Sequence, residues 1–255
     1  MRNFHRSKGS IELFIPRSPS GLRASGLGYT APGGWCIRFQ TCHYAQMPSE
    51  RTPWIVAVGA SGRQGLDDIR QLLEELPSTL AAVVMVVLHR PWHSPSHLQS
   101  ILTRHCALPI IIAAQGERFE AGKVYIGEPA EHLTLAAHSF GEIVDDPERR
   151  YGNRTVDLLF KSVAAHASTR MIGVVLSGSL DDGSHGLAAI HKAGGITMVM
   201  TPAVPPQHGM PESAAGYDGP IDLIGDPCRL ARGICEACEV SPESDRLRAI
   251  ASNLI

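Results

Sequence analysis

A turn of small residues, Gly59-Ala60-Ser61-Gly62-Arg63-Gln64-Gly65, stands between a short apolar segment and a helical pattern. Such a turn places the Ser61 hydroxyl beside the free N–H groups at the start of a helix. Ser61 could be a nucleophile whose oxyanion is held by backbone amides. The glycines could instead let a dinucleotide pyrophosphate approach the backbone, or could simply serve the turn. The turn alone leaves these three interpretations open.

Two more groups at the ends of apolar segments favour nucleophilic chemistry. His89 follows the apolar run 81–88, and two aspartates, Asp181 and Asp182, lie beyond the run 170–176. Together with Ser61 they would supply a nucleophile, a base and a group that orients the base. Each also has an ordinary alternative. The chain has twelve histidines, most of which must have other roles, and Asp181 or Asp182 could be a helix N-cap before Gly183. Their coincidence at predicted strand ends favours a hydrolase.

A dinucleotide site remains the alternative. It requires an acidic residue at the end of the second strand, or a cation for a 2′-phosphate, and Arg90 could serve NADP in that way. No tyrosine after residue 47 is followed four residues later by lysine, so the Tyr/Lys pair common in short-chain reductases is missing. The cofactor-binding interpretation is therefore weaker, but it stays open.

Two other patterns do not predict a metal or redox site. Cys235 and Cys238 have CxxC spacing, but no second CxxC completes a zinc site and the pair falls in a predicted helix. His93 and His97 are four apart, but Pro95 lies between them and no carboxylate completes a ligand set. We expect neither metal nor cofactor.

The elements that must position these residues alternate along the chain. Apolar runs read as strands and 3.6-residue periodicity reads as helices, which together predict an α/β fold with a doubly wound, mostly parallel sheet and helices on both faces. Functional sites in such sheets form at the carboxyl ends of the strands. The predicted strands are 54–58, 81–88, 109–114, 123–126, 170–176 and 195–200, and the predicted helices are 66–76, 95–105, 156–167, 183–193 and 226–236.

Composition excludes several other classes of protein. With 44 % hydrophobic and 19 % charged residues in 255, the chain can bury a core. Its net charge of −2 and scattered basic residues argue against nucleic-acid binding, and its longest apolar run, 80–88, is too short to cross a membrane. Six cysteines are too sparse for a disulfide scaffold, which favours a reducing cytoplasm.

The charge is divided unevenly along the chain. Residues 1–46 hold six basic residues and one acidic residue, whereas 47–255 hold 17 basic and 24 acidic residues. We interpret 1–46 as an unstructured extension, a transit segment, or sequence upstream of a true start at Met47. Residues 47–255 are expected to form one catalytic domain.

Ordered blocks of this sequence resemble the catalytic domain of the bacterial chemotaxis protein-glutamate methylesterases. They are Val56-Ala-Val-Gly-Ala-Ser61, Leu88-His-Arg-Pro91, Gly116-Glu-Arg-Phe-Glu-Ala-Gly-Lys-Val-Tyr-Ile-Gly-Glu-Pro129, His132-Leu133, Val156-Asp-Leu-Leu-Phe-Lys-Ser-Val-Ala164, Gly173-Val-Val-Leu-Ser-Gly178, Asp182-Gly183 and Gly209-Met-Pro-Glu-Ser-Ala214. The resemblance implies a doubly wound fold and hydrolysis of glutamyl methyl esters on the cytoplasmic helices of chemoreceptors, often with deamidation of receptor glutamines. A non-catalytic relative that binds receptors is a further alternative.

The resemblance also assigns roles to residues. The family nucleophile falls on Ser61, its histidine on His89 and its aspartate on Asp182, which would fix the imidazole tautomer. The oxyanion donors would be the backbone amides of Gly62 and Ser179. Two departures lie close to this site. The turn after Ser61 is one residue longer than usual, and the Met-Gly-Asn of the family becomes Ser179-Leu180-Asp181.

Regulation is expected to differ as well. Many relatives carry a receiver domain ahead of the esterase, but 46 residues cannot form one, because such a domain needs on the order of 100 residues. We therefore expect a stand-alone esterase that is either constitutively open or controlled by a separate regulatory partner.

Overall fold

The computed structural model describes residues 52–91, 96–152, 154–203, 208–217 and 219–239. All of them belong to one compact unit, Glu50–Ile255. The predicted extension 1–46 and the proposed start at Met47 lie outside the described residues, as does His93. The division into an extension and a catalytic domain from residue 47 stays a prediction.

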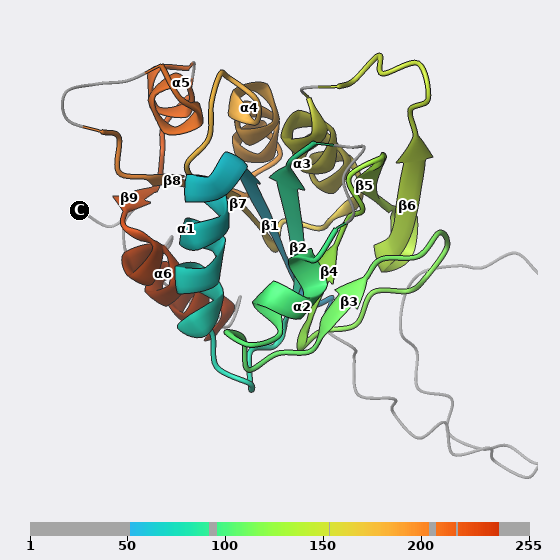
Figure 1. Cartoon of the computed structure of the whole chain (residues 1–255). Helices are drawn as coiled ribbons and strands as arrows, with labels where there is room; N and C mark the ends of the chain where they lie inside the picture. Colours follow the sequence, from blue (N-terminus) through green and yellow to red (C-terminus); the bar gives the residue numbers. More distant parts are fainter. Residues whose placement is uncertain (1–51, 92–95, 153, 204–207, 218, 240–255) are drawn as a thin grey trace, which may run out of the picture. The chain divides into compact units, whose positions relative to one another are not determined.

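A seven-stranded sheet forms the centre of this unit (Figure 1). Its strands lie in the order β3-β4-β2-β1-β7-β8-β9, and every neighbouring pair is parallel. The runs of valine and isoleucine in β1, β2 and β7 are buried throughout, as expected for strands covered on both faces. The strands are β1 (Trp54–Ser61), β2 (Ala82–His89), β3 (Ile110–Ile112), β4 (Lys123–Ile126), β7 (Met171–Val175), β8 (Ile196–Met200) and β9 (Leu223–Gly225).

Helices cover both faces of the sheet (Figure 1). On one face α1 (Gly62–Glu74), α2 (Leu98–Leu102) and α6 (Pro227–Glu239) bury their apolar sides, and on the other α3 (Thr155–His166), α4 (Ser184–Lys192) and α5 (Met210–Gly216) do so. Two separate hydrophobic clusters result, one on each face. The predicted doubly wound parallel α/β fold is confirmed.

A two-stranded antiparallel hairpin joins the second face. It consists of β5 (Glu131–Ala136) and β6 (Phe140–Asp145), linked by the 3-10 turn η1 (Ala137–Ser139). Leu133 and Leu135 of β5 are buried in the cluster that contains α3. The hairpin, α5 and β9 were not predicted from the sequence, and the predicted helix 95–105 is longer than the observed five residues of α2.

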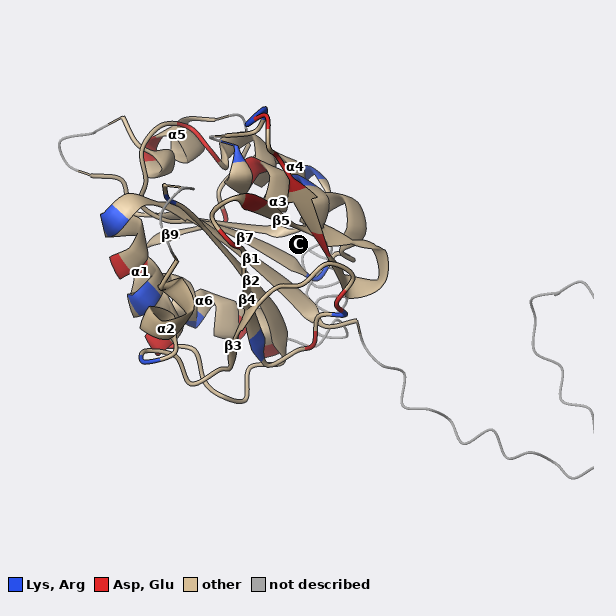
Figure 2. Ribbon diagram, turned by 45° about the vertical axis from the view of Figure 1, so that its right-hand side comes forward, with Lys and Arg blue, Asp and Glu red and all other residues tan. Residues whose placement is uncertain are grey.

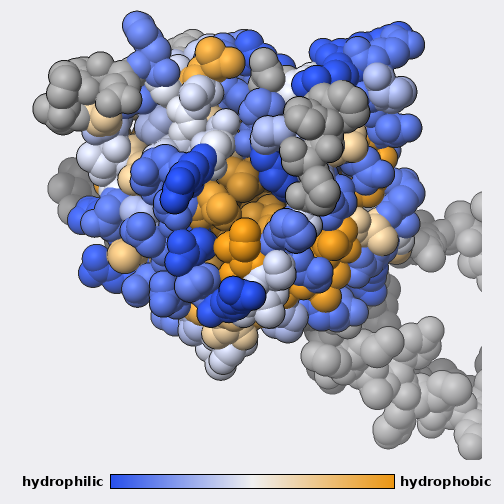
Figure 3. Space-filling model, viewed as in Figure 1, coloured by the Kyte–Doolittle hydropathy of each residue, from blue (hydrophilic) through white to orange (hydrophobic). Residues whose placement is uncertain are grey.

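Charged and apolar residues are distributed differently over the sheet and the elements around it. Figure 2 shows that the central strands carry almost no charged residues, which lie instead on the helices and loops around the sheet. In Figure 3, apolar side chains are visible near the middle of the viewed face and are surrounded by hydrophilic residues. None of the described helices has both the length and the apolar character that crossing a membrane requires. The sheet thus provides a neutral, rigid platform whose polar groups stand at its edges.

Candidate active site

Ser61 and His89 meet at the carboxyl edge of the sheet. Each is the last residue of its strand, β1 or β2, and the two are paired in the parallel register. Ser61 Oγ lies 3.4 Å from His89 Nδ1. This distance is at the long end for a hydrogen bond, as is common for catalytic pairs without a bound substrate. The structure therefore brings together the nucleophile and the base that the sequence predicted.

The backbone around Ser61 is tightly held. Its N–H donates to the Ser177 carbonyl at 2.9 Å, which ties the end of β1 to the loop after β7. The next residue, Gly62, has a φ of +69° and begins α1, so the chain turns sharply after the serine. Gly178 lies directly against Ser61, since a Cβ added there would stand 2.7 Å from the Ser61 Cβ. These contacts fix the hydroxyl at the mouth of the sheet.

The surroundings of His89 favour its neutral form. Burial has the largest effect and lowers the pKa of His89 below its usual value. A backbone hydrogen bond with Gly152 acts in the opposite sense, whereas the charges of Arg149 and His132 lower the pKa further. The imidazole is consequently neutral at pH 7, which is the form that can accept a proton from Ser61.

The second predicted oxyanion donor, Ser179, lies in the loop after β7. It forms an isolated antiparallel bridge with Gly209, and the hydrogen bond made there runs from the Met210 N–H to the Gly178 carbonyl. This bond does not use the Ser179 N–H. The neighbouring Leu180 has a φ of +70° and is 59 % exposed. A leucine thus holds the left-handed conformation that glycine ordinarily provides.

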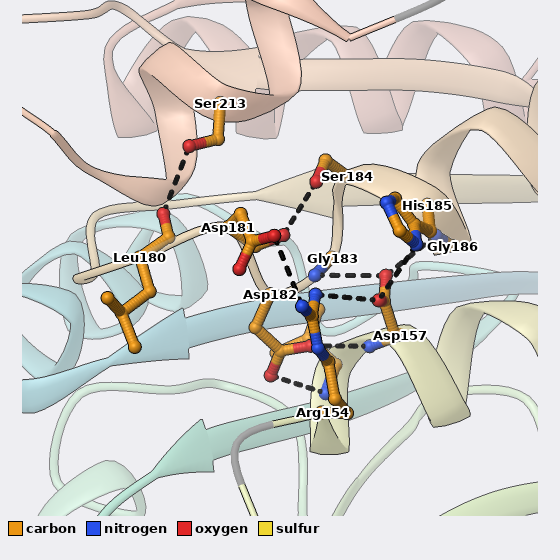
Figure 4. A network of polar contacts seen from close by, with 11 residues as sticks. Arg154, Asp157, Leu180, Asp181, Asp182, Gly183, Ser184, His185, Gly186 and Ser213 are labelled. Atoms are coloured by element: carbon orange, nitrogen blue, oxygen red, sulfur yellow. Dashed lines mark hydrogen bonds and ion pairs between the residues drawn. The ribbon is translucent and has the colours of Figure 1, made fainter.

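Asp182 is held by backbone N–H groups at the start of α3. Its carboxylate accepts the N–H groups of Val156 and Asp157, at 3.0 and 2.9 Å, and so caps the N-terminus of α3 (Figure 4). Among the described residues, no hydrogen bond joins Asp182 to His89. Burial is the main cause that raises the pKa of Asp182 to about 6, against the effect of its two N–H donors. The helix-capping alternative therefore describes its contacts.

Asp157, in turn, caps the N-terminus of α4. From the first turn of α3, its Oδ1 accepts the N–H groups of Gly183 and Gly186 at the start of α4, at 3.1 and 2.7 Å. The two helices thus cap each other: Asp157 in α3 caps α4, and Asp182, just before α4, caps α3 (Figure 4). Arg154 bridges the pair from outside, with ion pairs of 3.4 Å to Asp157 and 3.2 Å to Asp181. This exchange fixes the loop that carries Ser179.

A cavity of about 230 Å³ lies beside His89. Its wall is formed by the end of β2, by residues 127–133 and 145–147, and by Arg149, Gly152 and Thr155. Ser61 is not among the residues that line it. The site is therefore open beyond the Ser–His pair.

The residues considered for cofactors are arranged for other roles. The Arg90 guanidinium donates to the backbone carbonyls of Leu88 and Gly127, at 3.1 and 3.0 Å, and so is not presented to a phosphate. Burial raises the pKa of Cys238 to about 12, which disfavours the reactive thiolate. In the described ranges, no three histidine, cysteine or acidic side chains are grouped as a metal site requires.

Sequence reasoning missed two buried polar residues near His89. His132 Nε2 lies 3.2 Å from Asp146 Oδ2, and both side chains are at least nine-tenths buried. Asp146-Pro147 is a typical start of a turn, which could have indicated this role for the aspartate. His132 stands in one of the blocks that resemble the family, but its contact with Asp146 could not be predicted, because its position on β5 became clear only from the hairpin.

Fold and site together define a doubly wound α/β protein with a serine–histidine pair at the carboxyl edge of its sheet. Comparison with known proteins agrees with this class. The family model described as CheB methylesterase matches residues 56–231. The crystal structure of the Thermotoga maritima CheB methylesterase catalytic domain superposes with a TM-score of 0.64 at 25 % identity, covering 73 % of this chain and 99 % of that one.

Curated sequences give the same result. A protein-glutamate methylesterase/protein-glutamine glutaminase of Bordetella avium is 31 % identical over 75 % of this chain and 57 % of its own length. The corresponding protein of Yersinia pestis bv. Antiqua is 33 % identical over 85 % of this chain and 66 % of its own length. The chain belongs to the CheB methylesterase family. It spans between about half and two thirds of the curated relatives it matches.

Proposed function

We propose that this protein is a serine esterase that hydrolyses the methyl esters of glutamyl side chains in chemoreceptors. The observation that carries the proposal is the contact between Ser61 Oγ and His89 Nδ1, at the ends of two neighbouring parallel strands. Membership of the CheB methylesterase family supports the choice of substrate. Because such esters lie on the cytoplasmic helices of receptors, the protein would act in the cytoplasm.

The first half of the reaction forms an acyl-enzyme. Neutral His89 takes the proton of Ser61 as Oγ attacks the ester carbonyl, and the resulting oxyanion is stabilised by backbone N–H groups. When the tetrahedral intermediate collapses, the C–O bond to the methoxy group breaks and His89 returns the proton to it. Methanol leaves, and the glutamyl group stays bound to Ser61 as an ester.

The second half of the reaction releases the receptor. His89 removes a proton from a water molecule as the water oxygen attacks the acyl carbonyl. The bond between the carbonyl carbon and Ser61 Oγ then breaks, and His89 returns the proton to Oγ, which regenerates the Ser61 hydroxyl. The product is a free glutamate carboxylate. The same steps with ammonia as the leaving group would deamidate glutamine, in line with the glutaminase activity in the names of the relatives.

We assign the oxyanion donors to the backbone N–H groups of Gly62 and Ser179. Gly62 is the first residue of α1, where N–H groups have no acceptor within the helix and the helix dipole favours negative charge. The Ser179 N–H is left unused by the hydrogen bond between Met210 and Gly178. Asp182 supports this arrangement by fixing the Ser179 loop to α3.

The test replaces the nucleophile and leaves the fold intact. Ser61→Ala should reduce methanol release from a methylated receptor fragment by at least about 10³-fold. Ser100→Ala, an exposed serine on α2, is the matched control and should retain full activity. A serine-directed phosphonate should label Ser61, as identified by mass spectrometry.

Three results would count against the esterase. Full activity in Ser61→Ala would refute the mechanism, binding of the receptor without turnover would indicate a non-catalytic relative, and thermal stabilisation by NADP would favour the cofactor-binding alternative.

A further inference from the structure

One exposed residue near the nucleophile has a conformation that the fold does not explain. Leu180, in the loop after β7, has a φ of +70°, which glycine, asparagine and aspartate adopt far more readily than leucine. The residue is 59 % exposed, more than any other large apolar residue in the part of the chain that the structure describes. Burial therefore offsets little of this backbone strain. Strained residues of this kind concentrate at functional sites.

The residues just before Leu180 connect it to the nucleophile. A Cβ added to Gly178 would stand 2.7 Å from the Ser61 Cβ, so the backbone at this position lies directly against the serine. Ser179, which bridges to Gly209, carries the N–H that we assign to the oxyanion. Because consecutive Cα atoms are about 3.8 Å apart, the Leu180 Cα lies within about 8 Å of the Gly178 Cα. Leu180 thus stands at the rim of the reaction site.

The loop holds Leu180 in a fixed position. Its carbonyl accepts the Ser213 hydroxyl at 3.1 Å, which ties it to α5. On the other side, the Asp181 carboxylate forms an ion pair of 3.2 Å with Arg154, and the Asp181 carbonyl accepts the Ser184 hydroxyl at 2.6 Å. Figure 4 shows the Leu180 side chain pointing away from these polar contacts. The leucine is therefore an exposed apolar group that needs little ordering when a partner binds.

The space on the other side of the nucleophile is open. A Cβ added to Gly62, the residue after Ser61, would meet nothing within 4 Å. A helix that presents a glutamyl ester to Ser61 also presents, on the same face, the side chains three and four residues away, about 5–6 Å from the glutamyl residue. This spacing is similar to the separation of Leu180 from the backbone that touches Ser61. One turn of a bound helix can therefore reach both positions.

We propose that Leu180 is a specificity-determining residue, which contacts an apolar side chain of the receptor helix one turn from the glutamyl ester. The neighbouring Asp181 is already paired with Arg154, so recognition at this position depends on apolar contact and not on charge. The proposal rests on the proposed function, because it takes the methylated receptor helix as the substrate. It gives the leucine, which replaces the glycine of the family's Met-Gly-Asn, a role in binding.

The decisive variant is Leu180→Asn, because asparagine is similar in size and tolerates a positive φ but is polar. The experiment compares kcat/KM for methanol release from a methylated helical receptor fragment and from the γ-methyl ester of N-acetylglutamate, which has no helix to contact Leu180. For the fragment, kcat/KM should fall roughly 10-fold, mainly through KM, as expected when one leucine side chain loses its burial against a partner. For the small ester it should change less than twofold.

Two controls separate apolar contact from other effects. Leu180→Met keeps an apolar side chain of similar volume and should retain kcat/KM for the fragment within about threefold. Ile224→Thr removes an exposed apolar side chain from β9, three strands and so about 14 Å from β1, and should leave both rates unchanged.

Two results would overturn the proposal. If Leu180→Asn, shown to be folded by circular dichroism, retains wild-type kcat/KM for the receptor fragment, Leu180 does not contact the helix. If both substrates lose the same factor, the residue acts on the loop of Ser179 and not on the receptor.

Failure of the proposed function would be a separate result. A wild-type protein that releases methanol from neither substrate would refute the esterase. The Kd of the receptor fragment for Ser61→Ala, measured with and without Leu180→Asn, would still test the contact: a roughly 10-fold weaker Kd supports it, and an unchanged Kd refutes it.

Discussion

Replacing Gly178 with alanine should disable the site while the chain stays folded. A Cβ at this position would stand 2.7 Å from the Ser61 Cβ and 3.0 Å from the Ser61 nitrogen, and would also meet the Met210 sulfur. The sulfur is the end of a flexible side chain and can move aside. The Ser61 backbone cannot move so freely, because its N–H is bound to the Ser177 carbonyl. The strain therefore falls on the serine.

The size of the displacement follows from these distances. Ordinary contact of a Cβ begins at 3.4 Å, so Ser61 must retreat by about 0.7 Å. Its Oγ is already 3.4 Å from His89 Nδ1, and a further displacement of this size breaks the contact. A misplacement approaching 1 Å costs on the order of 100-fold in rate. Overpacking should also lower the free energy of unfolding by about 1–3 kcal/mol.

The assay compares kcat/KM for methanol release and the rate of phosphonate labelling at Ser61, with circular dichroism to verify folding. Gly216→Ala is the control, because a Cβ on this α5 glycine meets nothing within 4 Å. It should leave both rates unchanged. If folded Gly178→Ala labels and turns over at the wild-type rate, close packing against Ser61 does not position the nucleophile, and the reasoning is refuted.

Two further predictions concern stability. Because burial raises the pKa of Asp182 from 3.8 to about 6, the folded state binds extra protons between these values, and the free energy of unfolding should fall as pH rises through this window. Measured by urea titration, the free energy of unfolding of the wild type should fall by up to about 3 kcal/mol relative to that of Asp182→Asn between pH 3 and pH 7. If the difference between the two proteins stayed constant over this range, the buried environment assigned to Asp182 would be contradicted. Leu180→Gly should raise the free energy of unfolding by up to about 1 kcal/mol, because glycine adopts a φ of +70° without strain and the leucine side chain is exposed. A lower melting temperature in this variant would show instead that the leucine makes stabilising contacts.

Much of the fold could be predicted because its signals are local. The buried runs of β1, β2 and β7 and the periodicity of α1 and α3 can be seen in single segments of the sequence. The meeting of Ser61 and His89 could also be predicted, since both stand at carboxyl ends of strands in a parallel sheet. The hairpin was missed because β5 buries four consecutive residues and lacks a clear alternation of polar and apolar residues.

The partners of the carboxylates could not be predicted in the same way. Asp182 has two structural options, contact with an imidazole or capping of a helix, and sequence does not show which donors approach it. The cap is made by N–H groups 25 and 26 residues away in the chain. Likewise, Asp146 and His132 lie 14 residues apart and meet only because β5 and β6 pair in their observed register. The partners of both aspartates are therefore set by contacts between segments far apart in the sequence.

The exchange of caps between Asp157 and Asp182 has a consequence for how the molecule folds. The first-turn amides of α3 and α4 find these carboxylate partners only when both helices are docked on the sheet, so the two helix starts become stable together. Amide hydrogens at both starts should then exchange with solvent as one cooperative group. The loop between β7 and α4 is consequently rigid before any substrate arrives, and its ordering costs nothing at the moment of binding.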